Sequence, residues 1–208
     1  MSASGPASPG ALVLAAGAAS RMGEPKQLSV HEGEPLVCRA ASAAVQAGAH
    51  PVIVVLGAHA ALVAPALASL RGATLLVHDD WRDGLASSLA AGLRALLAAS
   101  ACDAILITLA DQPLVTADAL RALLAAFSTE RRIVAAEYGD GVGVPVVVGR
   151  EHAAELMALT GDRGAGAWLR THDADVTRLP LPAAEVDVDT PADLARLKAL
   201  RPSVNRSV

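Results

Sequence analysis

Short apolar runs alternate with longer mixed segments along this chain of 208 residues. The runs cover 11–15, 51–56, 73–77 and 104–110, and their length and continuity predict buried β-strands. Helices are predicted between and after them, because proline and glycine stand where a helix begins or ends. Continuous apolar strands that alternate with helices are typical of a parallel sheet covered on both faces. We therefore expect an α/β fold, a three-layer sandwich around a mostly parallel central sheet.

The predicted elements form one domain, at 11–201, with a short tail at each end. Residues 1–10 are rich in glycine, proline and serine and are expected to be disordered, and a second tail is expected at 202–208. The predicted helices are 35–48, 58–70 with a possible kink at Pro65, 84–99, a helix from Thr116 or Asp118 to Phe127, 151–159, one that begins within 160–168, and one after Thr190. The later strands are predicted at 133–136, 146–148, 176–179 at a sheet edge, and 186–189, with a glycine-rich loop at 138–145.

The first predicted strand runs into a loop of small residues, LVLAAGAASRMGEPK, which covers 12–26. Ligands of such sheets bind beyond the carboxyl ends of the strands. Gly17 would let backbone N–H groups approach an anion, and Arg21 and Lys26 could neutralise a polyphosphate. The spacing of Gly17, Gly23 and Lys26 is not that of a P-loop. The loop is predicted to hold a nucleoside triphosphate; the alternative is a flexible loop whose cations are only solvated.

Acidic residues follow two of the later predicted strands. Asp111 ends an apolar strand, where a carboxylate is a natural ligand for a hard cation such as Mg²⁺. A helix-capping role is weaker for it, because Thr116 or Asp118 is better placed to begin the next helix. Asp187 and Asp189 alternate along a predicted strand and so point to one face. One of them could share a metal with Asp111, or both could be helix-entry acids.

Two serines stand at the start of the helix that Gly84 opens. Ser87 and Ser88 fall in its first turns, where hydroxyl groups and free N–H groups could meet a base or a ribose. They could equally do no more than satisfy the helix start. The spacing alone leaves both roles open.

Composition narrows the possible partners. A net charge of −4 argues against a nucleic-acid surface, and no apolar run reaches the roughly 18 residues that span a bilayer. No positive charge precedes the apolar segment 11–19, so it does not fit a signal peptide. Cys38 and Cys102 lack metal-ligand spacing, and the six histidines show no zinc-ligand pattern. We expect a cytoplasmic protein with buried thiols and neither a nucleic-acid nor a membrane partner.

Five segments, in order along the chain, resemble the molybdenum cofactor cytidylyltransferases. These belong to the superfamily of nucleotidyltransferases with a Rossmann-like sheet, and the resemblance covers nearly all of 11–197. It implies transfer of CMP from CTP to the terminal phosphate of molybdopterin cofactor, with release of pyrophosphate. The product would serve a molybdenum hydroxylase. The segments are LAAGAASRMGEPK, PVIVVLGAH, DDWRDGLASSLAAGL, ILITLADQPLV, and GDRGA with DVDTPADL.

The resemblance also implies roles for individual residues. Arg21, Lys26 and Asp111 would form the catalytic set, and Asp111 with Asp189 would hold Mg²⁺. An ionised acceptor phosphate needs no general base, so catalysis would come from positioning and charge neutralisation. The implied nucleotide-binding residues are Leu14, Ala15, Ala16, Gly17, Arg21, Lys26, Gly84, Ser88 and Asp111, and the implied acceptor-side residues are Gly143, Pro145 and Asp162.

Three positions bear on specificity within the resemblance. Ala16 stands where the sister family that attaches GMP typically has glycine, which favours a pyrimidine, although one carbon discriminates by only about 1–3 kcal/mol. Val144 stands where the family often has histidine, and Gly166 where it often has arginine. Because both departures lie in the acceptor half, the nucleotide half of the site is better supported.

Two other functions fit the same residues. One is a nucleotidyltransferase for a sugar phosphate or another small phosphomonoester, which would differ only in its acceptor. The other is a non-catalytic carrier or insertion protein for molybdenum cofactor. A carrier needs no metal–triphosphate apparatus, so the presence of Arg21, Lys26, Asp111 and Asp189 together argues against it.

Overall fold

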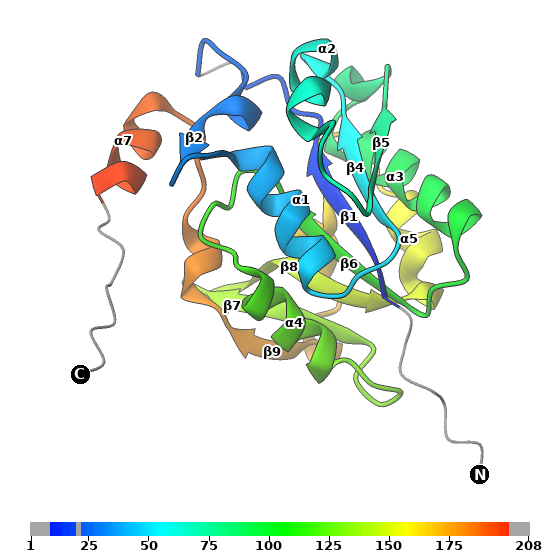
Figure 1. Cartoon of the computed structure of the whole chain (residues 1–208). Helices are drawn as coiled ribbons and strands as arrows, with labels where there is room; N and C mark the ends of the chain where they lie inside the picture. Colours follow the sequence, from blue (N-terminus) through cyan, green and yellow to red (C-terminus); the bar gives the residue numbers. More distant parts are fainter. Residues whose placement is uncertain (1–8, 20–21, 200–208) are drawn as a thin grey trace.

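The computed structural model describes residues 9–19 and 22–199 and contains a central sheet of seven strands in the order β5-β4-β1-β6-β8-β7-β9. Strand β8 is antiparallel to both its neighbours, and every other neighbouring pair is parallel. The predicted α/β fold with a mostly parallel sheet is confirmed (Figure 1). The strands are β1 (Pro9–Ala15), β4 (Val52–Leu56), β5 (Ala73–Val77), β6 (Ala104–Leu109), β7 (Ile133–Tyr138), β8 (Gly141–Gly149) and β9 (Thr177–Pro180).

Helices cover both faces of the sheet (Figure 1). Helices α1 (Leu36–Gln46) and α4 (Ala117–Ala126) pack on one face, and α3 (Leu85–Ala99), α5 (Ala153–Met157) and α6 (Ala165–Leu169) pack on the other. Strand β1 is buried on both sides, because Val13 contributes to one core cluster and Leu12 and Leu14 to the other. The remaining helices are α2 (Ala60–Val63) and α7 (Pro191–Ala199).

Short elements connect this framework. Helix α2 passes into a 3₁₀ turn at Pro65, which agrees with the predicted kink. A small hairpin, which the sequence analysis did not anticipate, pairs β2 (Val30–His31) with β3 (Glu34–Pro35). The 3₁₀ turns are η1 (Lys26–Leu28), η2 (Ala64–Leu67), η3 (Trp81–Asp83), η4 (Arg150–His152), η5 (Asp173–Asp175) and η6 (Pro182–Glu185).

The prediction of a disordered tail at 1–10 is wrong at its last two residues. Pro9 and Gly10 belong to β1 and pair with β6. A Cβ at Gly10 would lie 2.8 Å from a Leu96 methyl carbon, so the absence of a side chain lets α3 pack closely there. Residues 1–8 and the predicted tail at 202–208 lie outside the described residues.

Two predicted elements of the second half are also corrected. The expected glycine-rich loop at 138–145 is largely strand, because β8 begins at Gly141 and forms a hairpin with β7. A Cβ at Gly143 would lie 2.1 Å from the Tyr138 hydroxyl oxygen, so glycine leaves room here for the Tyr138 side chain. The segment 186–189 is not a strand of the sheet, although the Val188 N–H donates to the Asp111 carbonyl at 2.9 Å.

No helix within 9–19 and 22–199 combines the length and the apolar character needed to cross a membrane. This agrees with the absence of a long apolar run in the sequence.

Leu93→Ala tests how strongly α3 depends on its contact with the sheet. Leu93 is fully buried against both β-strand and helix residues of one core cluster, so we expect the free energy of unfolding to fall by about 2–5 kcal/mol. Urea unfolding monitored by circular dichroism measures this change. Leu62→Ala is the matched control, because Leu62 is 60% exposed, and its effect should stay within about 0.5 kcal/mol. Equal effects of the two substitutions would contradict the assigned core.

Candidate active site

The side-chain amide of Gln27 anchors the loop after β1 through hydrogen bonds. The Gln27 Nε2 donates to the carbonyl oxygens of Ala15 at 2.9 Å and Gly17 at 2.7 Å, and Gln27 is 2% exposed. The Ala16 carbonyl, between those two, accepts from the Ala58 N–H at 3.0 Å. Three successive carbonyls of the loop therefore point to partners within the protein, which fixes the path of the backbone.

A pocket of about 380 Å³ opens beside this loop, between the carboxyl ends of β1 and β6 and the start of α3. Its walls are largely apolar, and polar groups enter from a few directions, as in many small-molecule sites. Gly84 shapes one wall with φ = +101°, and a Cβ there would lie 2.4 Å from the Gly161 carbonyl oxygen. The lining residues are Leu14, Ala15, Ala16, Gly17, Ala18, Lys26, Gln27, Trp81, Arg82, Gly84, Leu85, Ser88, Leu109, Ala110, Asp111 and Asp162.

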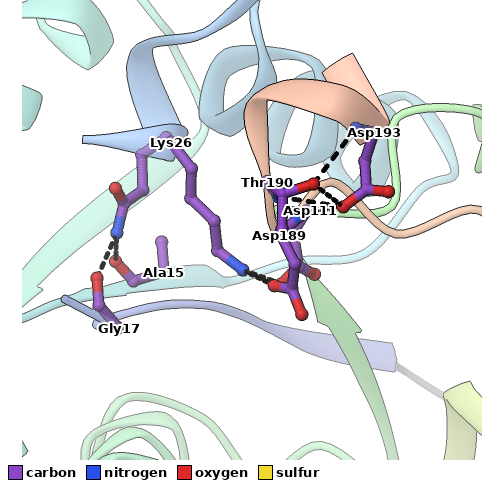
Figure 2. Close-up of polar contacts among 8 residues, drawn as sticks. Ala15, Gly17, Lys26, Asp111, Asp189, Thr190 and Asp193 are labelled. Carbon is purple, nitrogen blue, oxygen red and sulfur yellow. Dashed lines mark hydrogen bonds and ion pairs between the residues drawn. The ribbon is translucent and has the colours of Figure 1, made fainter. Parts of the chain in front are cut away.

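A lysine and two aspartates meet beside this pocket: Lys26 and Asp111 line it, and Asp189 contacts Lys26. The Lys26 Nζ lies 2.6 Å from Asp111 Oδ2 and 2.7 Å from Asp189 Oδ1 (Figure 2). Burial alone would lower the pKa of Lys26, but the two carboxylates more than offset this and raise it above its usual value. Lys26 therefore stays a cation, and it links segments that are 85 and 163 positions away along the chain.

Asp189 is held in place by the start of α7. The Thr190 N–H donates to Asp193 Oδ2 at 2.9 Å, and the Asp193 N–H bonds the Thr190 hydroxyl oxygen at 3.2 Å (Figure 2). This reciprocal capping box satisfies free N–H groups of the first helical turn, as the prediction of Thr190 as the N-cap requires. The Thr190 hydroxyl lowers the pKa of Asp193 through its hydrogen bond, so the cap is anionic.

Two carboxylates beside the pocket, those of Asp111 and Asp189, offer oxygen donors of the kind that a divalent cation takes. The described residues contain no group of three or more His, Cys, Asp or Glu side chains that could hold a metal, so these two would share the cation with other ligands such as phosphate oxygens. Asp111 Oδ1 is buried and has no hydrogen-bond partner in the structure, so one oxygen of this carboxylate is left unsatisfied. Nearby Asp187 has a pKa raised to about 7, because its carboxyl is partly desolvated and lies near Asp111 and Asp189. Carboxylate oxygens crowded in this way are the ligands that hard cations such as Mg²⁺ and Mn²⁺ take.

The structure brings most of the predicted nucleotide-binding residues to this one pocket. Arg21 lies outside the described residues. The two serines at the start of α3 differ in their surroundings. The Ser87 hydroxyl donates to the Gly84 carbonyl oxygen at 2.9 Å, a contact of the helix start, whereas Ser88 lines the pocket and is 2% exposed. The predicted residues in the lining are Leu14, Ala15, Ala16, Gly17, Lys26, Gly84, Ser88 and Asp111.

The predicted acceptor-side residues do not lie together. Asp162 lines the same pocket, and Gly143 and Pro145 lie on β8 outside its lining. The link from β8 to the site is Gln112, whose Nε2 donates to the Val144 carbonyl at 2.8 Å. The Tyr138 hydroxyl donates to the same carbonyl at 3.1 Å. Val144 thus contacts the site's framework through its backbone, which any residue there would supply.

Sequence reasoning missed Gln27, Trp81 and Arg82 in the pocket lining, and it missed Gln112, which lies outside the lining. Gln27 and Gln112 directly follow Lys26 and Asp111, but their amide contacts reach carbonyls that local patterns cannot identify. Trp81 and Arg82 belong to the quoted segment DDWRDGLASSLAAGL, so their proximity to Gly84 could have suggested them. The Arg82 guanidinium lies 4.4 Å from the centre of the Trp81 ring, a cation–π distance.

Comparison with known proteins identifies the family. The model of the MobA-like NTP transferase domain matches residues 11–176, well over half of the chain. The chain belongs to this family. It is therefore a nucleotidyltransferase by fold and domain, as the resemblance predicted, and a nucleoside triphosphate is the substrate that such a domain takes.

One relative and several solved structures are similar to this chain over most of its length. Nicotine blue oxidoreductase of Paenarthrobacter nicotinovorans is 34% identical over 198 residues, 89% of this chain and 94% of the relative. The structure of Rv0371c from Mycobacterium tuberculosis H37Rv is 34% identical, with a TM-score of 0.75, over 92% of this chain and 97% of that one. A nucleotidyl transferase from Methanothermobacter thermautotrophicus is 25% identical, with a TM-score of 0.77, over 92% and 96%. Rv0371c has also been solved with manganese, at 32% identity and a TM-score of 0.71 over 93% and 99%.

Gly84→Ala tests the wall of the pocket. The left-handed backbone and the contact with Gly161 both oppose a side chain, so we expect the free energy of unfolding to fall by about 1–3 kcal/mol. Nucleotide affinity, measured by isothermal titration calorimetry, should also weaken, because α3 must shift away from the pocket. Gly166→Ala is the control, since a Cβ at Gly166 meets nothing within 4 Å. A Gly84→Ala protein as stable as the control would show that the backbone is not constrained there.

Proposed function

We propose that this protein transfers CMP from CTP to the terminal phosphate of molybdopterin cofactor, in a Mg²⁺-dependent reaction that releases pyrophosphate. The observation that carries the proposal is the joint placement of a largely apolar pocket and the Lys26–Asp111–Asp189 cluster beside it. A base and ribose suit the apolar walls, and a triphosphate suits the charged cluster. Ala16 in the lining, rather than glycine, supports a pyrimidine base by the resemblance.

The proposed reaction exchanges one phosphoanhydride linkage at the α-phosphorus for another. An acceptor phosphate oxygen attacks the α-phosphorus, the new P–O bond forms, and the bond to the β-phosphate oxygen breaks. Pyrophosphate leaves with the electron pair of that bond. The acceptor phosphate is already ionised, so no side chain need remove a proton from it.

The residues of this chain supply position and charge for that step. The backbone of Ala15, Ala16 and Gly17 holds the nucleoside end, and the Lys26 ammonium neutralises phosphate charge. Arg21 is proposed as the second phosphate-binding cation, and Asp162 with Gly143 and Pro145 as the acceptor side. Asp111 and Asp189 would hold Mg²⁺, which supplies charge neutralisation at the phosphate oxygens when bound.

Pyrophosphate release tests the reaction and its nucleotide directly. With Mg²⁺ and molybdenum cofactor, we expect release with CTP and little with GTP, ATP or UTP, measured by a coupled pyrophosphatase assay. Preference for GTP would contradict the argument from Ala16. Release with CTP only when a sugar phosphate replaces the cofactor would favour the other acceptor class. Cofactor binding without release would identify a carrier.

Substitution of the acids tests the metal site. Asp111→Asn and Asp189→Asn keep the side-chain volume and remove the charge, so we expect the rate constant for CTP turnover to fall by about 100-fold or more. Asp118→Asn on α4 is the control, because Asp118 is exposed and lies outside the pocket lining. Turnover within about twofold of the unmodified enzyme would remove that aspartate from the mechanism.

A second candidate function is a redox reaction on nicotine blue. It is favoured by the 34% identity to nicotine blue oxidoreductase, which extends over 94% of that relative. The discriminating assay follows the absorbance of nicotine blue with the protein and NADH, which is added as a probe reductant. A change in absorbance that requires the protein, together with an absence of pyrophosphate release under every nucleotide, would replace the proposed transfer by a redox reaction.

A further inference from the structure

The Lys26 ammonium occupies the position between two carboxylates where a shared metal ion would sit. Its Nζ contacts one oxygen of Asp111 at 2.6 Å and one oxygen of Asp189 at 2.7 Å. A metal ion that bridges the two side chains must approach the same pair of carboxylates. Because both are cations, they repel at that distance, and a bound metal and the observed lysine position exclude each other.

A bound nucleotide would offer the Lys26 ammonium an alternative anionic partner. Lys26 lines the pocket, and its long side chain extends from η1 to the two aspartates (Figure 2). A triphosphate bound in the pocket would bring several negative charges close to Lys26. It would therefore offer the ammonium a new partner while the metal replaces it between the aspartates.

We propose that Lys26 blocks the metal position of the nucleotide-free enzyme and is drawn from it by the phosphates of the incoming nucleotide, so that metal binding is coupled to nucleotide binding. This inference rests on the proposed function for the identity of the nucleotide. The blocking step itself does not, because it concerns only the lysine, the two aspartates and the metal. By linkage, a metal that waits for the nucleotide also strengthens nucleotide binding by the same factor.

Metal binding to the nucleotide-free protein tests the blocking step. Free Mn²⁺ is followed by electron paramagnetic resonance in the unmodified protein and in Lys26→Met, and we expect the variant to bind Mn²⁺ about tenfold more tightly. Lys26→Gln is the second variant, should Lys26→Met fail to fold as judged by thermal melting. Equal Mn²⁺ affinity in the unmodified protein and the folded Lys26 variant overturns the inference.

Two controls separate blocking from a general change of charge. Lys198→Met removes the only other lysine of the sequence, which is exposed on α7. Arg82→Met removes a cation that lines the same pocket and has no ion pair with either aspartate among the described contacts. Both should bind Mn²⁺ within about threefold of the unmodified protein. Tightening by Arg82→Met equal to that of Lys26→Met would also overturn the inference.

A second measurement follows the lysine itself. With two lysines in the sequence, ¹⁵N-labelled lysine gives two ammonium signals, and Lys198→Met assigns them. We expect α,β-methylene-CTP with Mg²⁺ to shift the Lys26 signal and weaken its coupling to the carboxylates. A Lys26 signal unchanged by a nucleotide that binds would overturn the release step. Tighter Mn²⁺ binding by Lys26→Met, with no nucleotide bound by any protein, would support blocking and count against the proposed function.

Discussion

The ion pairs between Lys26 and two aspartates are the constraint on which the site depends. They join η1, the end of β6 and the start of α7, which are far apart in the sequence. Each partner is separately fixed, since Gln27 anchors the loop before η1 and the Thr190–Asp193 cap anchors Asp189. The hydrogen bond from Val188 to the Asp111 carbonyl ties the two acidic segments directly. Three sets of hydrogen bonds therefore hold the lysine and the two aspartates in contact.

The pocket beside these charges is lined mostly by aliphatic and small residues, and Trp81 is the one aromatic residue in its lining. Aromatic residues are 2% of the sequence, so α3 and the sheet must approach closely to exclude water. Gly92 permits this approach, because a Cβ there would lie 2.8 Å from a Val55 methyl carbon. A dry wall next to the charged cluster lowers the local dielectric constant and strengthens the interactions of Lys26 with any anion that enters. Close packing of the pocket walls thus strengthens the electrostatic attraction between Lys26 and an anionic ligand.

Much of this arrangement could be predicted from local patterns. The apolar run 104–110 placed Asp111 at the end of a strand, and the loop after 11–15 placed Lys26 at the same sheet edge, because both depend on continuous hydrophobicity. The segment 186–189 was mispredicted as a strand, since its alternation of valine and aspartate reflects burial of Val188 beside the site and not sheet pairing. Gln27 could not be found, because its role depends on carbonyls that only the folded loop brings to it.

The carboxylates of Asp111, Asp187 and Asp189 lie close together, and the single positive charge of Lys26 does not balance them. Burial first, and then the nearby Asp111 and Asp189 carboxylates, raise the pKa of Asp187 to about 7, so a further negative charge there is unfavourable. Asp111 also keeps one buried oxygen without a hydrogen-bond partner. A protein selected only for stability would gain by replacing such a group with an apolar one. A divalent cation that binds these carboxylates during catalysis would account for the arrangement. Similarity in sequence to an oxidoreductase does not by itself require such a cation.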